Sequence, residues 1–484
     1  MKRKRTPARY AAFLIAALAF AIVVYAPLKE SFLTAGQAHL TETGRTALGI
    51  LAFCLVLWIL EPIPFHITGF LGILLMFFLR VESFADLIKQ GFGNETIVFF
   101  IGVLSISAMV TKTGLGRRIC ICMLAKTGND THKIILGFLL IGAFLAMWMT
   151  EMAAAAILMP LGVTILQQEG VQPKESRFGK ALMIACAWGP VIGGMGTPAG
   201  AGANPLAIGF LKDIAGISVT FSQWMVYGIP ASLSLILPSW LMLLIFFPPE
   251  KRYLKKTKEE MEQEAEKLPP ISRDERNTLC IFAVTIILWI MSGWIGKKSG
   301  LPISTSIPAL ISLCLLFMPG VTSISWKEVQ RTISWDGILL IACGISLGLA
   351  VYDTGAAGWL ALLLLNGIAK APIILRIFMI ILIVSILKIG LSSNTVTASI
   401  IVPVMIVLAD TYGLPIMGIA MPACLTLSLA FILVTSSPTN VIPYSAGYFT
   451  IGDMAKAGIV LTLVSCVILS FVFYFTGMVT GIYI

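Results

Sequence analysis

Long apolar stretches recur along most of this chain, and short polar segments separate them. An apolar stretch of about 20 residues spans a bilayer as a helix, whereas the segments of a membrane β-barrel are shorter and alternate in polarity. The pattern therefore predicts an all-α polytopic membrane protein. The predicted helices lie at 11–27, 46–62, 66–80, 97–115, 134–149, 153–168, 179–196, 224–247, 279–297, 303–319, 336–352, 357–369, 372–388, 396–409, 415–434 and 456–480.

One polar interruption occurs twice, about half a chain apart. The triplet 150–152 (Thr-Glu-Met) and the triplet 393–395 (Ser-Asn-Thr) stand at the same distance ahead of a proline, Pro160 or Pro403. The apolar runs on either side of each triplet are best drawn as re-entrant helical hairpins. We expect the two triplets to form the hairpin tips.

A second polar break follows each triplet. Residues 193–205 are rich in glycine and contain Asn204, and residues 435–440 end at Asn440. Unpaired backbone groups cost several kcal/mol in hydrocarbon, so irregular backbone persists only inside protein or beside a watery cavity. Paired interruptions at matching places in two halves point to the binding site of a transporter. The sequence thus predicts two repeats with the site between them.

The segment 248–277 differs from the rest of the chain because it is charged and poor in apolar residues. It predicts a cytoplasmic linker that divides the chain into an N-terminal membrane repeat, 1–247, and a C-terminal membrane repeat, 278–484.

Composition and charge agree with a membrane protein. The chain has 484 residues, 58% of them hydrophobic and 12% charged, with a net charge of +10. Basic residues cluster at the start (Lys2, Arg3, Lys4, Arg5 and Arg9) and beside predicted helix ends, which is the pattern that holds loops in the cytoplasm. We therefore expect a cytoplasmic N-terminus, an uncleaved first span at 11–27, a place in the cytoplasmic membrane and no nucleic-acid partner.

The residues at the breaks suit anions and small cations. A helix that begins inside the membrane presents free N–H groups and the positive end of its dipole, which bind carboxylate or phosphate oxygens. Freed carbonyls together with Ser, Thr and Asn oxygens suit a hard cation such as sodium. Glycines at the first break let backbone approach a ligand closely.

Taken together, the Ser-Asn-Thr triplet with its proline, the Gly-Gly-x-Gly-Thr-Pro break and the Ser-Pro-Thr-Asn break resemble the divalent anion:sodium symporters (DASS). The resemblance covers nearly the whole chain. It implies two inverted repeats with about 11 transmembrane helices, two re-entrant hairpins, and scaffold and transport domains that work as an elevator. It further implies a homodimer that moves di- or tricarboxylates such as succinate, malate and citrate, coupled to sodium or to exchange.

The resemblance to this family also implies which residues form the substrate and ion sites. The implied substrate contacts are Thr150, Glu151, Pro198, Ser393, Asn394, Thr395, Ser437 and Pro438. The implied ion-coupling positions are Glu151, Gly196, Lys388, Ser392, Asn394 and Ser436. Sodium is the expected coupling ion, and no organic cofactor or other metal is expected.

The sequence departs from the family pattern at two charged residues. In the first half, Ser-Asn-Thr has become Thr150-Glu151-Met152, and Lys388 stands five residues before Ser393. Intramembrane charges are costly and are functional candidates. Glu151 and Lys388 could pair across the repeat interface, with the Lys388 ammonium standing in for a cation in an exchanger that needs no sodium. Alternatively, Glu151 could carry a proton, or Glu151 could be a stronger cation ligand than asparagine. A structural salt bridge or a snorkelling lysine is the alternative without function.

An ionised, unpaired Glu151 would repel a dianion, since unit charges 4 Å apart interact by about 4 kcal/mol at an effective dielectric constant of ~20. Glu151 should therefore be paired or protonated when substrate binds.

Rival functions have weaker support. Gly344-Ile-Ser346-Leu-Gly348 matches a nucleophile-elbow pattern but falls inside an apolar helix, and no phosphate loop or zinc-protease motif occurs. We expect a carrier rather than an enzyme. An inorganic divalent anion such as sulfate remains an alternative substrate.

Overall fold

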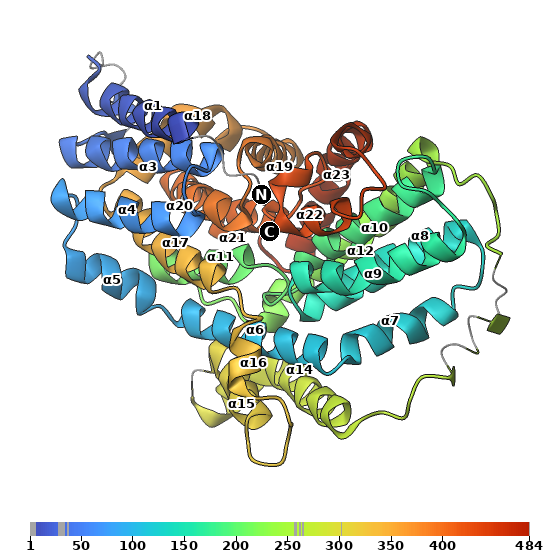
Figure 1. Cartoon of the computed structure of the whole chain (residues 1–484). Helices are drawn as coiled ribbons and strands as arrows, with labels where there is room; N and C mark the ends of the chain where they lie inside the picture. Colours follow the sequence, from blue (N-terminus) through green and yellow to red (C-terminus); the bar gives the residue numbers. More distant parts are fainter. Residues whose placement is uncertain are drawn as a thin grey trace.

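The computed structural model describes residues 6–27, 34–35, 38–255, 259–260, 263, 266–301 and 303–483. Figure 1 shows a bundle of long helices in which helices from the two halves of the chain pack against each other near the centre. The elements are α1 (Thr6–Tyr25), β1 (Thr34–Ala35), β2 (Ala38–His39), α3 (Glu42–Leu60), α4 (Phe65–Phe78), α5 (Phe84–Phe92), α6 (Glu95–Lys112), α7 (Leu115–Ala125), α8 (Thr131–Trp148), α9 (Glu151–Gln168), α10 (Arg177–Gly194), α11 (Ala203–Ala215), α12 (Phe221–Phe246), α14 (Arg273–Ser299), α15 (Ser306–Leu316), α16 (Trp326–Gln330), α17 (Trp335–Asp353), α18 (Ala356–Ala369), α19 (Ile373–Gly390), α20 (Asn394–Thr411), α21 (Ile416–Thr426), η1 (Val434–Ser436), α22 (Pro438–Tyr444) and α23 (Ile451–Val479).

Within the described ranges, the regular secondary structure is helical, apart from the two-residue antiparallel pair β1–β2 and an isolated bridge. Within these ranges, 11 helices are long and apolar enough to cross a membrane. The predicted all-α polytopic fold is therefore confirmed. The basic residues Lys2, Arg3, Lys4 and Arg5 lie outside the described part of the chain.

Helices α8 and α9 form the first predicted hairpin, with residues 149–150 at its tip. The open end of this hairpin lies beside the linker, where Lys255 N donates to Glu169 Oε1 at 2.8 Å. Its tip reaches the gap between α10 and α11, where Glu151 N donates to Gly200 O at 3.0 Å. Because α11 continues beyond this gap for 13 residues, the hairpin turns back partway through the bundle.

Helices α19 and α20 form the second hairpin in the same manner. Residues 391–393 make its tip, which reaches the gap between α21 and α22. There Lys388 Nζ donates to Ser436 O at 2.9 Å. Each hairpin tip therefore meets the break of the broken helix that follows it in sequence.

The two repeats run in opposite directions. The first broken helix begins on the linker side, where Lys180 of α10 pairs with Asp453 at the start of α23 at 3.0 Å. The second begins near the other end of α23, where Tyr483 Oη donates to Gly418 O of α21 at 2.7 Å. Equivalent helices thus enter the bundle from opposite sides, in agreement with the predicted inverted repeats.

The prediction of one continuous helix over 415–434 is wrong. α21 ends at Thr426, and residues 427–433 carry no helical assignment before the short turn η1. The segment is apolar, so hydropathy alone suggests a helix, but Asn440 bonds two of its carbonyls, those of Ala430 and Leu433. The short helices α5, α7, α11, α16 and α22 were also absent from the predicted set.

The charged linker is attached at both of its described ends. At its start, Thr131 N donates to Arg252 O and Leu254 N donates to Asn129 O, each at 2.9 Å. At its end, Arg118 of α7 donates to Pro269 O at 2.8 Å. Residues 256–258, 261–262 and 264–265 of the linker lie outside the described part, and the three-part division of the chain stays a prediction.

Candidate functional site

The two hairpin tips are capped in the same way. Thr150 accepts a hydrogen bond from Ala153 N at 3.4 Å and caps α9, and Ser393 accepts one from Val396 N at 3.4 Å and caps α20. A hydroxyl at this position bonds a free N–H of the first turn, which fixes where the helix begins. The predicted equivalence of Thr150 and Ser393 is therefore visible in the local structure.

The first break is folded tightly against the first tip. The Thr197 hydroxyl donates to Met147 O in the last turn of α8. A side chain at Gly194 would place its Cβ 2.8 Å from Glu151 Oε2, and one at Gly193 would collide with the backbone of Ala143. The glycines predicted to permit close approach of backbone do so here, and what they approach is the first hairpin.

The charged residues of the two halves meet at the second tip. Asn394 Nδ2 donates to Glu151 Oε1 at 2.9 Å, and Lys388 Nζ donates to Asn394 Oδ1. The Asn394 amide thus lies between a carboxylate and an ammonium, with its oxygen toward Lys388 and its nitrogen toward Glu151. We refer to Glu151, Asn394 and Lys388 as the triad.

The triad is completed by polar groups of the second break. Lys388 Nζ donates to Ser436 O at 2.9 Å, and Ser437 Oγ donates to Glu151 Oε1 at 3.5 Å. Thr439, which sequence analysis did not select, is fully buried two residues after Ser437. Its place in the Ser-Pro-Thr-Asn motif was the signal available in the sequence.

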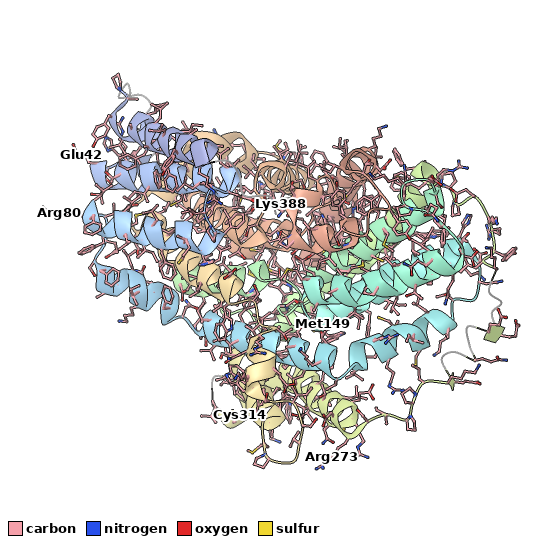
Figure 2. The ribbon with its side chains drawn as sticks, viewed as in Figure 1. Glu42, Arg80, Met149, Arg273, Cys314 and Lys388 are labelled. Atoms are coloured by element: carbon pink, nitrogen blue, oxygen red, sulfur yellow. The ribbon has the colours of Figure 1, made fainter. Side chains whose placement is uncertain are left out.

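The triad is buried in the interior of the bundle. The exposed fraction is 6% for Glu151, 2% for Lys388 and 8% for Asn394. Lys388 and the tip residue Met149 are labelled in Figure 2 and lie away from the periphery, where Glu42, Arg80 and Arg273 are found. Lys388 therefore does not snorkel to the surface, which excludes that alternative.

Two buried oxygens at the triad have no hydrogen-bond partner among the described residues. These are Glu151 Oε2 and Thr439 Oγ1. Buried polar atoms are nearly always bonded, so such atoms mark a place where a ligand, an ion or a proton completes the structure.

The remaining predicted site residues belong to the same hairpin tips and helix breaks. A Cβ on Gly202 would lie 3.6 Å from Thr395 Oγ1, which places Thr395 beside the first break. Pro438 begins α22 directly after Ser437. For Pro198, Gly196 and Ser392, the described structure records no polar contact with the triad.

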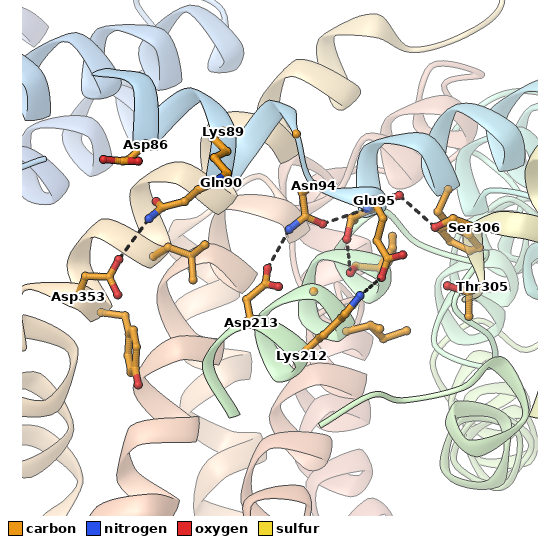
Figure 3. A pocket seen from close by; sticks show the side chains of 18 residues that line it. Asp86, Lys89, Gln90, Asn94, Glu95, Lys212, Asp213, Thr305, Ser306 and Asp353 are labelled. Atoms are coloured by element: carbon orange, nitrogen blue, oxygen red, sulfur yellow. Dashed lines mark hydrogen bonds and ion pairs between the residues drawn. The ribbon is translucent and has the colours of Figure 1, made fainter. Parts of the chain in front are cut away.

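A separate cavity of about 630 Å³ opens on the side opposite the linker, between α5, α6, α11, α15 and α17 (Figure 3). Across it, Lys212 of α11 pairs with Glu95 of α6, and Asn94 Nδ2 donates to Asp213 Oδ2 at 2.8 Å. The predicted substrate and coupling residues do not line this cavity. It is therefore distinct from the candidate site.

Comparison with known proteins identifies relatives along nearly the whole chain. The model of the sodium:sulfate symporter transmembrane region matches residues 10–482. The sodium-dependent dicarboxylate transporter SdcS of Staphylococcus saprophyticus is 26% identical over 456 residues, which cover 90% of this chain and 87% of that protein. SdcS of Staphylococcus aureus is 28% identical over 451 residues, covering 89% and 86%.

Solved structures share the fold at low sequence identity. The YdaH transporter of Alcanivorax borkumensis superposes with a TM-score of 0.55 at 13% identity, over 82% of this chain and 88% of that one. MtrF of Neisseria gonorrhoeae gives a TM-score of 0.53 at 14% identity, over 98% and 95%. At these identities the likeness concerns the fold alone.

These relatives are transporters and not enzymes, which agrees with the interpretation of the Gly-x-Ser-x-Gly match at 344–348 as coincidence. That match lies within α17 and has no strand–turn–helix context. With the family model matched over most of its length, this multi-pass membrane protein belongs to the sodium:sulfate symporter family, the divalent anion:sodium symporters that its motifs resemble.

Proposed function

We propose that this protein is a secondary carrier that moves divalent organic anions, of the succinate, malate and citrate type, across the cytoplasmic membrane. The observation that supports it most is the meeting of two hairpin tips and two helix breaks at one buried centre, through Asn394, Glu151 and Ser437. The dicarboxylate class is supported by the names of the SdcS relatives.

The proposed anion site uses the second tip. The N-terminus of α20, with Ser393, Asn394 and Thr395, supplies N–H groups and small polar side chains that suit carboxylate oxygens. Thr150 contributes from the first tip. Pro198, Ser437 and Pro438 frame the space between the tips.

The proposed movement is that of an elevator. In this proposal α8–α12 and α19–α23 form the transport domain, and the other membrane helices form the scaffold. The chain works as a homodimer with its N-terminus in the cytoplasm.

The triad bears on which ion, if any, is transported together with the anion. The sodium-dependent relatives support sodium coupling. However, Lys388 Nζ is held by two oxygens, Asn394 Oδ1 and Ser436 O, which are the kind of ligand that a small cation uses. A fixed ammonium in this place supplies a positive charge without sodium. This observation favours a second candidate, anion exchange in which the second half needs no sodium. In the first half, Glu151 and Gly196 remain the candidate coupling residues.

Purified protein in liposomes tests the proposal. Uptake of labelled succinate, malate, citrate and sulfate is measured with sodium, proton and counter-substrate gradients imposed one at a time. The proposal expects saturable uptake of at least one dicarboxylate and stimulation by internal dicarboxylate. Uptake of sulfate alone would overturn the substrate class, and transport of none of the four would overturn the function.

A further inference from the structure

An aromatic ring from α6 reaches the backbone of the first break. Gly202, just before α11, has φ −63° and ψ −22°, a conformation that any residue adopts. What this position lacks is space, because a Cβ there would lie 3.2 Å from Phe100 Cζ and 3.6 Å from Phe100 Cε2. The first of these distances is tighter than ordinary van der Waals contact. The ring of Phe100 therefore accounts for the glycine at 202.

The ring lies beside a residue of the proposed anion site. The same Cβ position at Gly202 is 3.6 Å from the hydroxyl oxygen of Thr395, in the first turn of α20. The edge of the Phe100 ring and the Thr395 hydroxyl thus lie on the same side of Gly202. Both residues are largely buried, with exposed fractions of 6% for Phe100 and 9% for Thr395.

The neighbouring Phe99 has a different surrounding. Its ring centroid lies 6.0 Å from that of Trp289 on α14. Successive side chains of a helix point about 100° apart, so the two phenylalanines cannot face the same neighbour. Phe99 packs within the proposed scaffold, whereas Phe100 bridges the proposed scaffold and the proposed transport domain.

The chemistry of the ring edge suits one class of anion. An aromatic ring is apolar, and its edge carries a partial positive charge. It can pack against methylene groups without repelling a nearby carboxylate, but it supplies no hydrogen bond. A sulfate ion presents oxygens in every direction, and each oxygen buried without a donor is costly. A dicarboxylate has an apolar middle that needs no donor.

We propose that Phe100 determines the specificity of the anion site, as the wall against which the methylene groups of a short dicarboxylate pack. This inference rests on the proposed function and narrows its substrate class to aliphatic dicarboxylates. Thr395 binds a carboxylate, and the ring beside it excludes water from the carbon chain. Because Phe100 belongs to the proposed scaffold, the wall stays in place when the transport domain moves.

Competition for uptake tests this assignment. The full-length protein in liposomes takes up labelled succinate, and unlabelled succinate, glutarate, adipate or sulfate competes, so that an inhibition constant is obtained for each anion. One methylene contact in an apolar pocket changes discrimination about 10–200-fold. Phe100→Ala should therefore raise the inhibition constant of succinate at least about tenfold and that of the longer adipate by less. The constant of sulfate, which has no carbon chain, should stay as in the wild type.

Two further variants locate the effect. Phe99→Leu changes the adjacent ring, which packs on Trp289, and should keep the wild-type ratios among the four inhibition constants. Gly202→Ala approaches the same contact from the other side, since its Cβ displaces the Phe100 ring. It should weaken inhibition by succinate in the wild-type background and have a smaller effect when combined with Phe100→Ala.

The ratio of the succinate constant to the sulfate constant decides the matter. A purely structural role of Phe100 would change all four constants by a common factor, and an unchanged ratio in Phe100→Ala would overturn this inference alone. If Phe100→Ala fails to fold, the same ratio in Phe100→Leu and in Gly202→Ala gives the answer. Uptake of no dicarboxylate by the wild type would overturn the proposed function, and this inference with it.

Discussion

Asn204 and Asn440 make the same pair of hydrogen bonds in the two halves of the chain. Asn204 Nδ2 donates to the carbonyls of Gly194 and Thr197 at 2.7 and 2.8 Å. Asn440 Nδ2 donates to those of Ala430 and Leu433 at 2.6 and 3.3 Å. In both cases the acceptors stand ten and seven residues before the asparagine. In each half, one asparagine side chain thus bonds two carbonyls at the break of the helix.

The first prediction concerns these two asparagines. Asn204→Ala and Asn440→Ala each remove two hydrogen bonds and leave one carbonyl, Gly194 O or Ala430 O, without its donor, whereas Thr197 O and Leu433 O keep a backbone donor. An unsatisfied buried group costs about 1–3 kcal/mol. Both variants should lower the thermal unfolding temperature in detergent by a similar amount. Asn277→Ala, which removes one bond to Val321 O in the other part of the molecule, is the control and should lower it less. A neutral effect of one variant and a large effect of the other would argue against their equivalence.

The second prediction concerns Asn394. Asn394→Ala should abolish uptake and leave expression intact, because Asn394 bonds both Lys388 and Glu151 and is proposed to bind the anion. A hydrogen bond to a charged group contributes about 1.5–3 kcal/mol, so loss of the proposed bond to the anion alone should lower uptake at low anion concentration at least about tenfold. Proteoliposome uptake against anion concentration measures it. Wild-type transport in this variant would refute the proposed site.

The third prediction concerns Lys388. Lys388→Met leaves Glu151 buried without a counter-charge, and breaking a buried pair in this way costs about 3–5 kcal/mol. The unfolding temperature should fall sharply, and the double variant Glu151→Gln/Lys388→Met should recover part of the loss. If Lys388 supplies the positive charge proposed above, the double variant should also depend more strongly on sodium than the wild type. Sodium titrations of uptake decide this, and an unchanged sodium dependence would remove Lys388 from the coupling scheme.

The fourth prediction concerns the contact between α6 and α11 at the cavity of about 630 Å³ that these helices line. Asn94 and Asp213 are hydrogen-bonded there, and the two helices belong to different proposed domains. With both residues changed to cysteine, a short bifunctional thiol reagent should block uptake, and each single cysteine variant should be insensitive. The background carries serine at the exposed Cys122, Cys280 and Cys314. Full uptake after complete cross-linking would contradict an elevator.

The fifth prediction concerns Asp130, which precedes α8. Burial alone would raise the pKa of its carboxyl, but hydrogen bonds from His132 N, Lys133 N and Arg252 outweigh burial and lower it. A lowered folded-state pKa gives stability that is present above the unfolded value of about 4 and is lost as the pH falls through the folded value.

Asp130→Asn keeps an oxygen that can cap α8 but loses the ion pair with Arg252, so it should destabilise the protein at neutral pH by at most about 1 kcal/mol, and by less in acid. Thermal unfolding as a function of pH measures the difference. The exposed Asp410 changed to asparagine should have no such effect. A loss of stability that grows as the pH falls would contradict this assignment.

The sequence was sufficient for the two hairpins and insufficient for the internal order of the candidate site. Thr150 and Ser393 were identifiable because a polar residue ahead of an apolar run is a helix-start signal that does not depend on distant contacts. The orientation of the Asn394 amide depends on groups that come from α9, α19 and η1, far apart in the chain. Direct pairing of Glu151 with Lys388 was one hypothesis, and the structure inserts Asn394 between them.

The helix predicted at 415–434 shows the limit of hydropathy. A window average counts apolar side chains and does not register whether backbone carbonyls have partners. Residues 427–433 are as apolar as a membrane helix, yet Asn440 supplies donors to this segment from outside it. The first break was recognised because its glycines and Pro198 disfavour a helix locally.

The attachment of the linker at both ends would limit the movement of the hairpin in the proposed elevator. Lys255 is bonded to the end of α9, and Pro269 is bonded to Arg118 on α7. A fully extended chain covers about 3.5 Å per residue, so residues 256–268 could span at most about 45 Å between these anchors. Shortening this segment one residue at a time would measure the distance of the proposed hairpin movement. Transport should stop once the segment is too short to span that distance.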